Sequence, residues 1–431
     1  MRLVLPALDI NPSNPYEKDV LKGRQELGET LISLVKNFED PLTISINAGW
    51  GEGKSTFLRM WEADLKNESA KVVMFDAFLH DYQEDIFTSF IGAISAELEP
   101  LTRLSKEKKS FVVAGKKVLK VATKIGLGVG LRVLSANAVG SECMQSAIEE
   151  AKINSGELVD HFINESLENY KTSDQAIKHF KEALKKLSEK LKSETGYPLV
   201  VIVDELDRCR PNYAVELLEK IKHFFDVDNV VFVLGVNKQQ LKHSICSVYG
   251  NIDANEYLQK FISLEFGLTK TKKDFSGKGY DAYVAYLFNG HGFKGEHHDS
   301  LKELCASAGL TPREMNHLFM QLALCVVGRG ENEEFMWLYS LLCVLKIKDF
   351  ELYQKAQSEN LTLSDLEKNS NILCYLQKNK RVYEFWKYVL SGEVAEGTDY
   401  SSLCNRIGIW SSDEVVPQFC EWIDKFVLPS K

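Results

Sequence analysis

The stretch Thr43–Leu58, TISINAGWGEGKSTFL, decides the fold: a β-branched run leads into a glycine-rich turn and then into the start of a helix. Its turn contains three alternating glycines, Gly49, Gly51 and Gly53. Glycine adopts positive φ freely, so we expect these residues to let backbone N–H groups wrap around an anion. Lys54 then supplies a charge for the outer phosphates of a nucleotide, and the Ser55 hydroxyl, at the helix N-terminus, can ligate Mg²⁺. The stretch predicts a phosphate-binding loop in an α/β fold.

This loop departs from the common pattern G-x-x-x-x-G-K-[ST] at its first position, where Ala48 replaces glycine. Alanine is the smallest possible change, and we expect Gly49 to take over the turn. A glycine-rich turn that binds nothing is the alternative, but the strand, the GKST run and the helix are all in register. The residues predicted to contact the nucleotide are Ala48, Gly49, Trp50, Gly51, Glu52, Gly53, Lys54, Ser55 and Thr56.

A second apolar run, Leu199–Val203, shows no alternation and predicts a strand buried on both faces of a parallel sheet. Three acids stand at its carboxyl end, Asp204, Glu205 and Asp207, where α/β sheets place their chemistry. Asp204 fits the carboxylate that holds Mg²⁺ together with Ser55, and Glu205 is placed to orient or deprotonate the attacking water. An acidic turn after a core strand is the alternative, which the GKST loop in the same chain disfavours.

Two further polar residues follow predicted structural elements. Asn237 ends the buried run 229–237, where its side chain can reach a γ-phosphate or the attacking water; asparagine is also a favoured helix N-cap, and the two roles are compatible. Arg313 follows Thr311 and Pro312 at a predicted helix start. A cation there opposes the helix dipole, so we expect Arg313 to be held for another purpose.

Composition limits the classes of protein. The chain has 431 residues, of which 45% are hydrophobic and 26% charged, and its net charge of −9 argues against a general nucleic-acid coat. Nine scattered cysteines form neither a disulfide framework nor a zinc pattern, which favours reduced thiols and a cytoplasmic location. We find no secretory signal, and no uncharged apolar run long enough to span a membrane.

The segment 101–140 differs sharply from the rest of the chain. Between residues 103 and 132, nine lysines and arginines face one acid, a local balance of +8. A basic amphipathic stretch followed by an apolar one is typical of a peripheral membrane contact, here at the inner face of the membrane. A helical hairpin with solvated lysines explains the pattern equally well, and nucleic-acid contact is a third, weaker interpretation. We expect two long helices in 141–196.

Four motifs in this order resemble the KAP family of P-loop NTPases, signalling ATPases of the AAA+ and STAND kind: AGWGEGKST, DELDRC, VVFVLGVNKQQL with YLQKFISLEF, and TPRE. The resemblance implies ATP and Mg²⁺ as ligands and makes Lys260 and Arg313 candidates for phosphate contact, within one chain or across a subunit interface. Family members commonly insert paired membrane helices where 101–140 lies, and bacterial members are linked to defence against phage. The chain departs from the family pattern at Ala48, Asp76, Phe78 and Asn237.

We therefore predict an α/β P-loop NTPase with a parallel sheet flanked by helices, a helical insert and an all-helical C-terminal region. The predicted units are the first half of the core, the insert, the second half of the core, a helical lid and a C-terminal helical region, at 1–100, 101–196, 197–270, 271–330 and 331–431. The predicted function is a slow ATP-hydrolysing switch that forms a homo-oligomer and meets a protein partner through its C-terminal helices. The alternative is a binding module that holds nucleotide without turnover.

Overall fold

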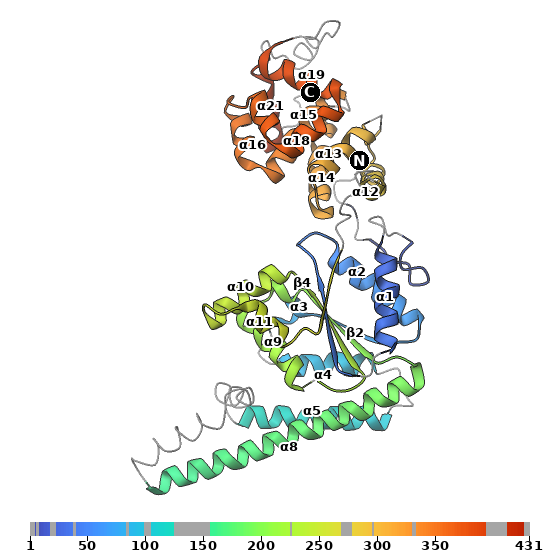
Figure 1. The fold of residues 1–431 in the computed structure, drawn as a ribbon, viewed down its shortest axis with the longest axis vertical. Helices are drawn as coiled ribbons and strands as arrows, with labels where there is room; N and C mark the ends of the chain where they lie inside the picture. Colours follow the sequence, from blue (N-terminus) through green and yellow to red (C-terminus); the bar gives the residue numbers. More distant parts are fainter. Residues whose placement is uncertain are drawn as a thin grey trace.

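A five-stranded parallel sheet joins the two parts of the chain that flank the basic segment (Figure 1). The computed structural model describes residues 5, 8–17, 23–37, 40–82, 86–98, 105–124, 156–224, 226–268, 278–294, 297–329, 333–393 and 412–425. The strand order is β2-β3-β4-β1-β5. The strands are β1 (Leu42–Asn47), β2 (Lys71–Asp76), β3 (Leu199–Asp204), β4 (Val230–Val236) and β5 (Leu264–Gly267).

The central strands are buried on both faces, as their unbroken apolar runs predict. Every residue of β3 and β4 is buried, and β4 pairs with β3 on one side and β1 on the other. The carboxyl ends of these three parallel strands therefore meet at one edge of the sheet. The predicted fold class is confirmed. We did not predict β5, a four-residue edge strand that is mostly exposed and so carries no buried run.

Two separate cores cover the two faces of the sheet. Helices α1 (Arg24–Asn37) and α2 (Lys54–Asn67) pack on one face, where the Trp61 indole N–H donates to the Gly28 carbonyl at 3.2 Å. The other face carries α4 (Ile86–Glu97), α9 (Pro211–Phe224), α10 (Lys238–Tyr249) and α11 (Ala254–Gln259). Two short elements, α3 (Ala77–His80) and the 3₁₀ turn η3 (Leu206–Arg208), follow β2 and β3.

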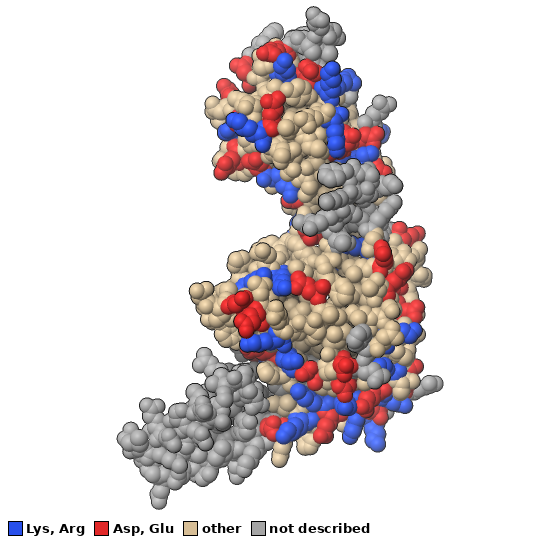
Figure 2. Space-filling view, in the orientation of Figure 1, with Lys and Arg blue, Asp and Glu red and all other residues tan. Residues whose placement is uncertain are grey.

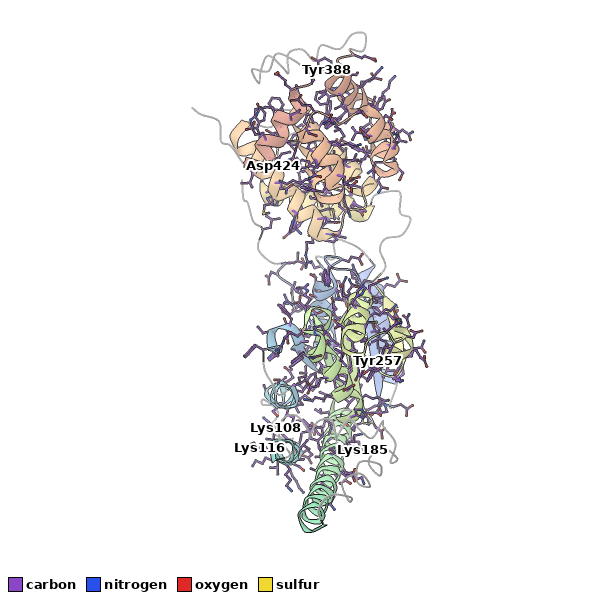
Figure 3. All side chains as sticks on the ribbon, turned by 90° about the vertical axis from the view of Figure 1, so that its left-hand side faces the viewer. Lys108, Lys116, Lys185, Tyr257, Tyr388 and Asp424 are labelled. Carbon is purple, nitrogen blue, oxygen red and sulfur yellow. The ribbon has the colours of Figure 1, made fainter. Side chains whose placement is uncertain are left out.

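Helices α5 (Ser105–Lys124) and α8 (Gly156–Thr195) pack side by side below the sheet. The rings of Phe111 and Phe180 lie 5.4 Å apart, and Phe111 is fully buried. Lys116 is exposed on α5, as Lys185 is on α8 (Figure 3). In this pair of helices, called the α5–α8 hairpin below, Phe111, Ala114 and Val118 of α5 are buried, whereas Val113 is 53% exposed. Residues 125–140, the apolar part of the basic segment, lie outside the described residues.

Part of the insert expected to form two long helices, 141–196, is described by the structure. Residues 156–195 form one helix of 40 residues, α8. No glycine or proline interrupts the run after Gly156, so nothing in the sequence ends the helix before Thr195. Residues 141–155 lie outside the described part of the chain. Among the described helices, none combines the length and apolar character needed to cross a bilayer.

Helices that follow the sheet build a third core, shown as a lobe of its own in Figure 1. They are α12 (Lys278–His291), α13 (His298–Ser307), α14 (Pro312–Arg329), α15 (Glu333–Lys348), α16 (Phe350–Gln357), α17 (Leu363–Lys368), α18 (Ser370–Lys378), α19 (Lys380–Ser391) and α21 (Val415–Lys425). One continuous cluster runs from Val284 to Ile423, with Trp386 fully buried in it. The segments 271–330 and 331–431 therefore share one hydrophobic core. Figure 2 shows acidic and basic side chains interspersed on the outside of this lobe.

Candidate functional site

The glycine-rich loop turns at two of its three glycines. Gly51 and Gly53 have φ of +81° and +84°, in the left-handed region, whereas Gly49 does not have positive φ. Ala48 is buried, and its N–H donates to the carbonyl of Val236 at 3.1 Å, which extends the pairing of β1 with β4. Alanine fits because Ala48 is the last residue that pairs with β4 and needs no positive φ. Gly49 begins the turn without positive φ, since its carbonyl accepts from the Glu52 N–H at 3.4 Å.

Helix α2 begins directly at the loop. Gly53 is its N-cap in left-handed conformation and carries no side chain to cap the first turn, which consists of Lys54, Ser55 and Thr56. First-turn N–H groups have no intrahelical acceptor, and together with the helix dipole they favour an anion. The loop is tied from outside as well, since the buried Arg24 guanidinium donates to the Glu52 carbonyl at 2.9 Å. The loop therefore has the form of an anion cradle.

Asp204 lies at the carboxyl end of β3 and is only 7% exposed. Burial raises the pKa of its carboxyl group, while hydrogen bonds from the Ser55 hydroxyl and the Glu205 N–H and the charge of Lys54 lower it. Gly235 on β4 makes room for it, because a Cβ at Gly235 would lie 2.8 Å from Asp204 Oδ1. A hydroxyl and a carboxylate on adjacent elements form the oxygen donor set that Mg²⁺ prefers, so these residues fit the ion.

Glu205 follows with an unusual backbone. Its φ is +59°, a left-handed conformation that is rare for residues other than glycine, asparagine and aspartate. The Arg208 guanidinium donates to its Oε2 at 2.9 Å. Burial raises the pKa of the Glu205 carboxyl group, and the charge of Arg208 lowers it. The spacing of three residues in DELDR is the sequence signal for this pair, which we had not identified.

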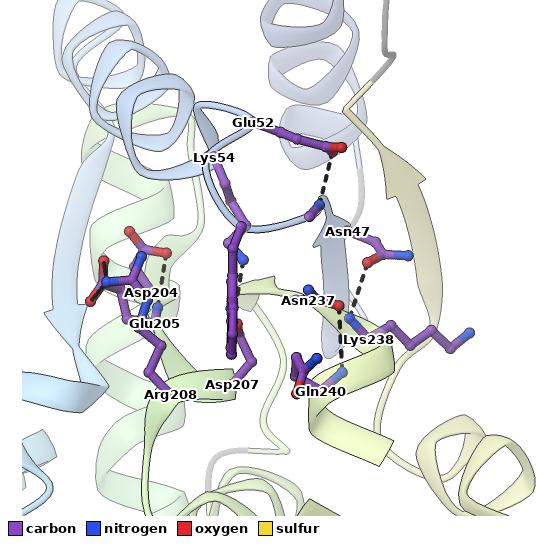
Figure 4. A network of polar contacts seen from close by, with 12 residues as sticks. Asn47, Glu52, Lys54, Asp204, Glu205, Asp207, Arg208, Asn237, Lys238 and Gln240 are labelled. Carbon is purple, nitrogen blue, oxygen red and sulfur yellow. Dashed lines mark hydrogen bonds and ion pairs between the residues drawn. The ribbon is translucent and has the colours of Figure 1, made fainter. Parts of the chain in front are cut away.

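Asp207 contacts the loop directly, and we assigned it no role from the sequence. Its Oδ1 lies 3.3 Å from Lys54 Nζ, and its Oδ2 accepts the Trp50 indole N–H at 2.5 Å. Figure 4 shows Lys54 extended from the loop toward Asp207. The loop is thus joined to the acidic strand end by a buried ion pair and by a hydrogen bond.

Asn237 lies at the end of β4, between the loop strand β1 and the acidic strand β3. Its side-chain oxygen accepts from the N–H groups of Gln239 and Gln240 at 3.1 and 3.4 Å (Figure 4). The cap role is therefore present, and the sensing role stays a prediction. Asn47 at the end of β1 accepts in the same way from the Lys238 N–H, at 3.1 Å.

Arg313 is brought to the loop through its backbone. Its N–H donates to the Gly51 carbonyl at 3.3 Å, while its side chain is exposed. Thr311 and Glu314 cap this end of α14 reciprocally, with the Thr311 N–H donating to Glu314 at 2.7 Å and the Glu314 N–H to the Thr311 hydroxyl at 3.3 Å. Burial raises the pKa of Glu314, but the ion pair with Lys348 and the Thr311 bonds outweigh it and hold the pKa below its usual value.

Lys260 does not join this group of residues. It lines a pocket with Thr43 and Val230, which lie where β1 and β4 begin, so it sits at the edge of the sheet opposite the loop. Its ammonium group lies 5.6 Å from the centre of the Tyr257 ring. Contact of Lys260 with phosphates held by the loop of the same chain is therefore excluded by the fold, and only the contact across a subunit interface stays a prediction.

Comparison with known proteins adds a family and distant relatives. Residues 24–324 match the KAP family P-loop domain. An uncharacterized protein of Methanocaldococcus jannaschii, MJ0182, is 27% identical over 164 residues, which cover 36% of this chain and 83% of that protein. The phage T7 exclusion protein of Escherichia coli is 23% identical over 240 residues, 53% of this chain but only 30% of that protein.

Solved structures give a weaker likeness. Two structures of the Aeropyrum pernix ORC2 protein, described as its ADPNP-ADP complexes and its ADP form, are 13% and 11% identical to this chain and cover 94% and 98% of it. The matches cover 94% and 97% of those chains. The TM-score is 0.35 for both, so we draw no conclusion from them.

Proposed function

Because the chain belongs to the KAP family of P-loop NTPases, we propose that it is an Mg²⁺-dependent ATPase that works as a slow, nucleotide-driven switch. The observation that supports this most is the arrangement at one edge of the sheet. Lys54, the Ser55–Asp204 pair and Glu205 all lie where the parallel strands β1 and β3 end, on either side of β4. Neither a purely structural loop nor an acidic turn needs that combination.

Each residue has a role in this proposal. The loop amides and Lys54 hold the phosphates, and Ser55 and Asp204 hold Mg²⁺, which when bound offsets phosphate charge. Glu205 accepts the proton of the attacking water, a role for which a raised carboxyl pKa is suited. The left-handed φ of Glu205 is the kind of backbone strain that functional sites retain. Asn237 and Arg313 sense the γ-phosphate.

The switch is supported by a chain of contacts that leaves the loop. The Gly51 carbonyl accepts from the Arg313 N–H, Glu314 caps the same helix end, and Glu314 pairs with Lys348 on α15 at 2.8 Å. A change in loop conformation on nucleotide binding would therefore act on two helices of the C-terminal core.

Substitution of Glu205 tests hydrolysis. We expect Glu205→Gln to lower phosphate release by about 100-fold, because general-base catalysis contributes factors of this size, and to leave ATP binding in place. Glu189→Gln on the exposed side of α8 is the matched control and should leave turnover unchanged. Unchanged turnover in Glu205→Gln would remove Glu205 from its proposed role. Light scattering with and without Mg·ATP tests homo-oligomer formation in the same samples.

A nucleotide-holding module without turnover is the second candidate function. Two ion pairs favour this module, because Lys54 is already paired with Asp207 and Glu205 is already paired with Arg208 within the protein. Tight ATP binding without phosphate release, in the monomer and the oligomer alike, would support this module over the ATPase.

We further propose a cytoplasmic protein that meets a protein partner through residues 331–431. A role in anti-phage defence is suggested by the phage T7 exclusion protein, although the match spans less than a third of that protein. Among the described residues of 101–140, membrane contact would use exposed lysines such as Lys109 and Lys116, because Phe111, Ala114 and Val118 are buried in the protein.

A further inference from the structure

Asp207 is the acid of the strand end that the proposed ATPase does not use. Its side chain is 1% exposed, and that of its partner Lys54 is 8% exposed. One carboxylate oxygen faces the Lys54 ammonium group and the other accepts from the Trp50 indole. Both of the groups that Asp207 holds belong to the phosphate-binding loop.

Burial makes this contact an energetic constraint. A buried ammonium group without a counter-charge is strongly disfavoured, so Lys54 needs an anion beside it. Asp207 supplies one, and the phosphates of a nucleotide would supply another at the same nitrogen. The two anions repel each other at short range, because like charges close together disfavour the doubly charged arrangement. Lys54 therefore cannot be fully paired with both.

Asp207 also differs from Asp204 in what surrounds it. Asp204 accepts from the Glu205 N–H and has the Ser55 hydroxyl beside it, a setting that suits a metal ligand. Asp207 accepts from an ammonium group and an indole, which are donors without free lone pairs for a cation. The chemistry at Asp207 is that of an anion that stands in for phosphate.

We propose that Asp207 is a positioning residue that competes with nucleotide phosphate for Lys54 and holds Trp50 against the strand end until phosphate takes over the lysine. This proposal rests on phosphate binding by the loop, as proposed above. The apparent nucleotide affinity is then the intrinsic affinity multiplied by the fraction of molecules in which Lys54 is not paired with Asp207. Trp50 is 47% exposed, so release of its N–H changes the polarity around the indole and with it the fluorescence.

The experiment measures Mg·ADP binding to the full chain by calorimetry, so that hydrolysis plays no part. We expect Asp207→Asn, which keeps an oxygen for Trp50 but removes the charge, to bind Mg·ADP roughly tenfold more tightly than wild type. Asp81→Asn is the matched control. Asp81 is also buried, at 8% exposed, and pairs with Arg210 at 2.7 Å, but no contact joins it to the loop lysine. Its affinity should stay within about twofold of wild type.

Trp50 fluorescence is the second readout, obtained as the difference between wild type and Trp50→Phe. Mg·ADP should shift this emission in wild type, and Asp207→Ala, which leaves the Trp50 N–H without its acceptor, should show the shifted emission before nucleotide is added. If Asp207→Asn does not fold, Trp50→Phe serves in its place. The loss of the indole N–H removes one of the two donors that hold Asp207 beside Lys54, so we expect Mg·ADP to bind about threefold more tightly.

Two outcomes are separable. If wild type binds Mg·ADP and the folded Asp207→Asn variant binds it equally or more weakly, Asp207 supports Lys54 instead of competing for it, and this inference is overturned while the proposed function stands. Equal or weaker binding by Trp50→Phe overturns it in the same way when that variant is used. If wild type takes up no Mg·ADP, the proposed function and the inference both fall.

Discussion

The carboxyl edge of the sheet and the α5–α8 hairpin use charge in opposite ways. In the Lys54–Asp207 pair the side chains are 8% and 1% exposed, whereas in the Lys185–Asp228 pair, which ties α8 to the loop before β4, they are 50% and 45% exposed. An exposed pair contributes about 0 to 1 kcal/mol, while burying a charged group costs several kcal/mol before its partner repays it. The hairpin has many charges that contribute little to stability, whereas the sheet edge has few charges, each with a large energetic effect.

This difference warns against counting charges. The local balance of +8 is the strongest charge signal in the sequence, yet Lys106, Lys109, Lys116 and Lys117, among its lysines of described exposure, point to solvent from α5. The acids that follow β3 are a weaker signal, yet two of them, Asp204 and Asp207, are at most 7% exposed. Burial, which depends on the fold, decides which charges are candidates for function.

The largest effect we expect is for the buried lysine. Lys54→Ala removes the charge at the loop and should weaken ATP binding by at least about 100-fold, since charge-assisted contacts to phosphate are the strongest in the site. Lys185→Ala is the matched control, because that lysine is half exposed on α8. Calorimetry of both variants with Mg·ATP checks this. Equal ATP affinities of the two variants would contradict the proposed difference between the buried and the exposed lysine.

A smaller effect distinguishes two left-handed glycines. Gly196 after α8 has φ of +77° with open space around its Cβ position, so Gly196→Ala should cost only the backbone strain, about 1 kcal/mol. Gly51 has φ of +81°, and a Cβ there would lie 2.6 Å from Arg313 Cβ, so Gly51→Ala should cost about 3 kcal/mol and also weaken ATP binding. Thermal melting and calorimetry measure both. Similar melting points for the two variants would show that α14 does not press on the loop.

The pH dependence of stability sharpens the comparison further. Burial raises the pKa of Asp204 above its unfolded value, so neutral Asp204 stabilises the fold at low pH and this contribution is lost as pH rises through the folded pKa. With a metal chelator present, Asp204→Asn should therefore have a higher melting temperature than wild type at neutral pH. The difference in melting temperature should shrink toward acid pH. Asp228→Asn, at an exposed pair, should show no such gain. A gain that grows toward acid pH would contradict the argument.

The smallest effect is expected on the hairpin. Lys116→Glu with Lys117→Glu changes exposed side chains, so we expect the melting point to move by no more than about 1 °C. Sedimentation with anionic liposomes is the second measurement. Any binding of wild type through these lysines should be lost in the double variant, because both side chains are exposed on α5. Binding that survives the charge reversal would rule out contact through these lysines.

Local sequence patterns predicted much of the fold and part of the site. The buried strands, the loop and the acids at the strand end are each contained in short runs, and the order of the strands brings them together. The Asp207–Lys54 pair could not be found this way, because its members are far apart in sequence and only the packing of β3 near α2 joins them. The burial of the apolar face of α5 was likewise undecidable, since it depends on Phe180 of another helix.

The contact between Arg313 and Gly51 has a consequence for how this chain can vary. Both atoms of that hydrogen bond belong to the main chain, so it survives exchange of the arginine for any residue except proline. The sensing role proposed for the guanidinium group can therefore drift or disappear during evolution while the physical link between loop and helical lobe persists. Relatives that have lost hydrolysis could keep the same mechanical connection and put it to another use.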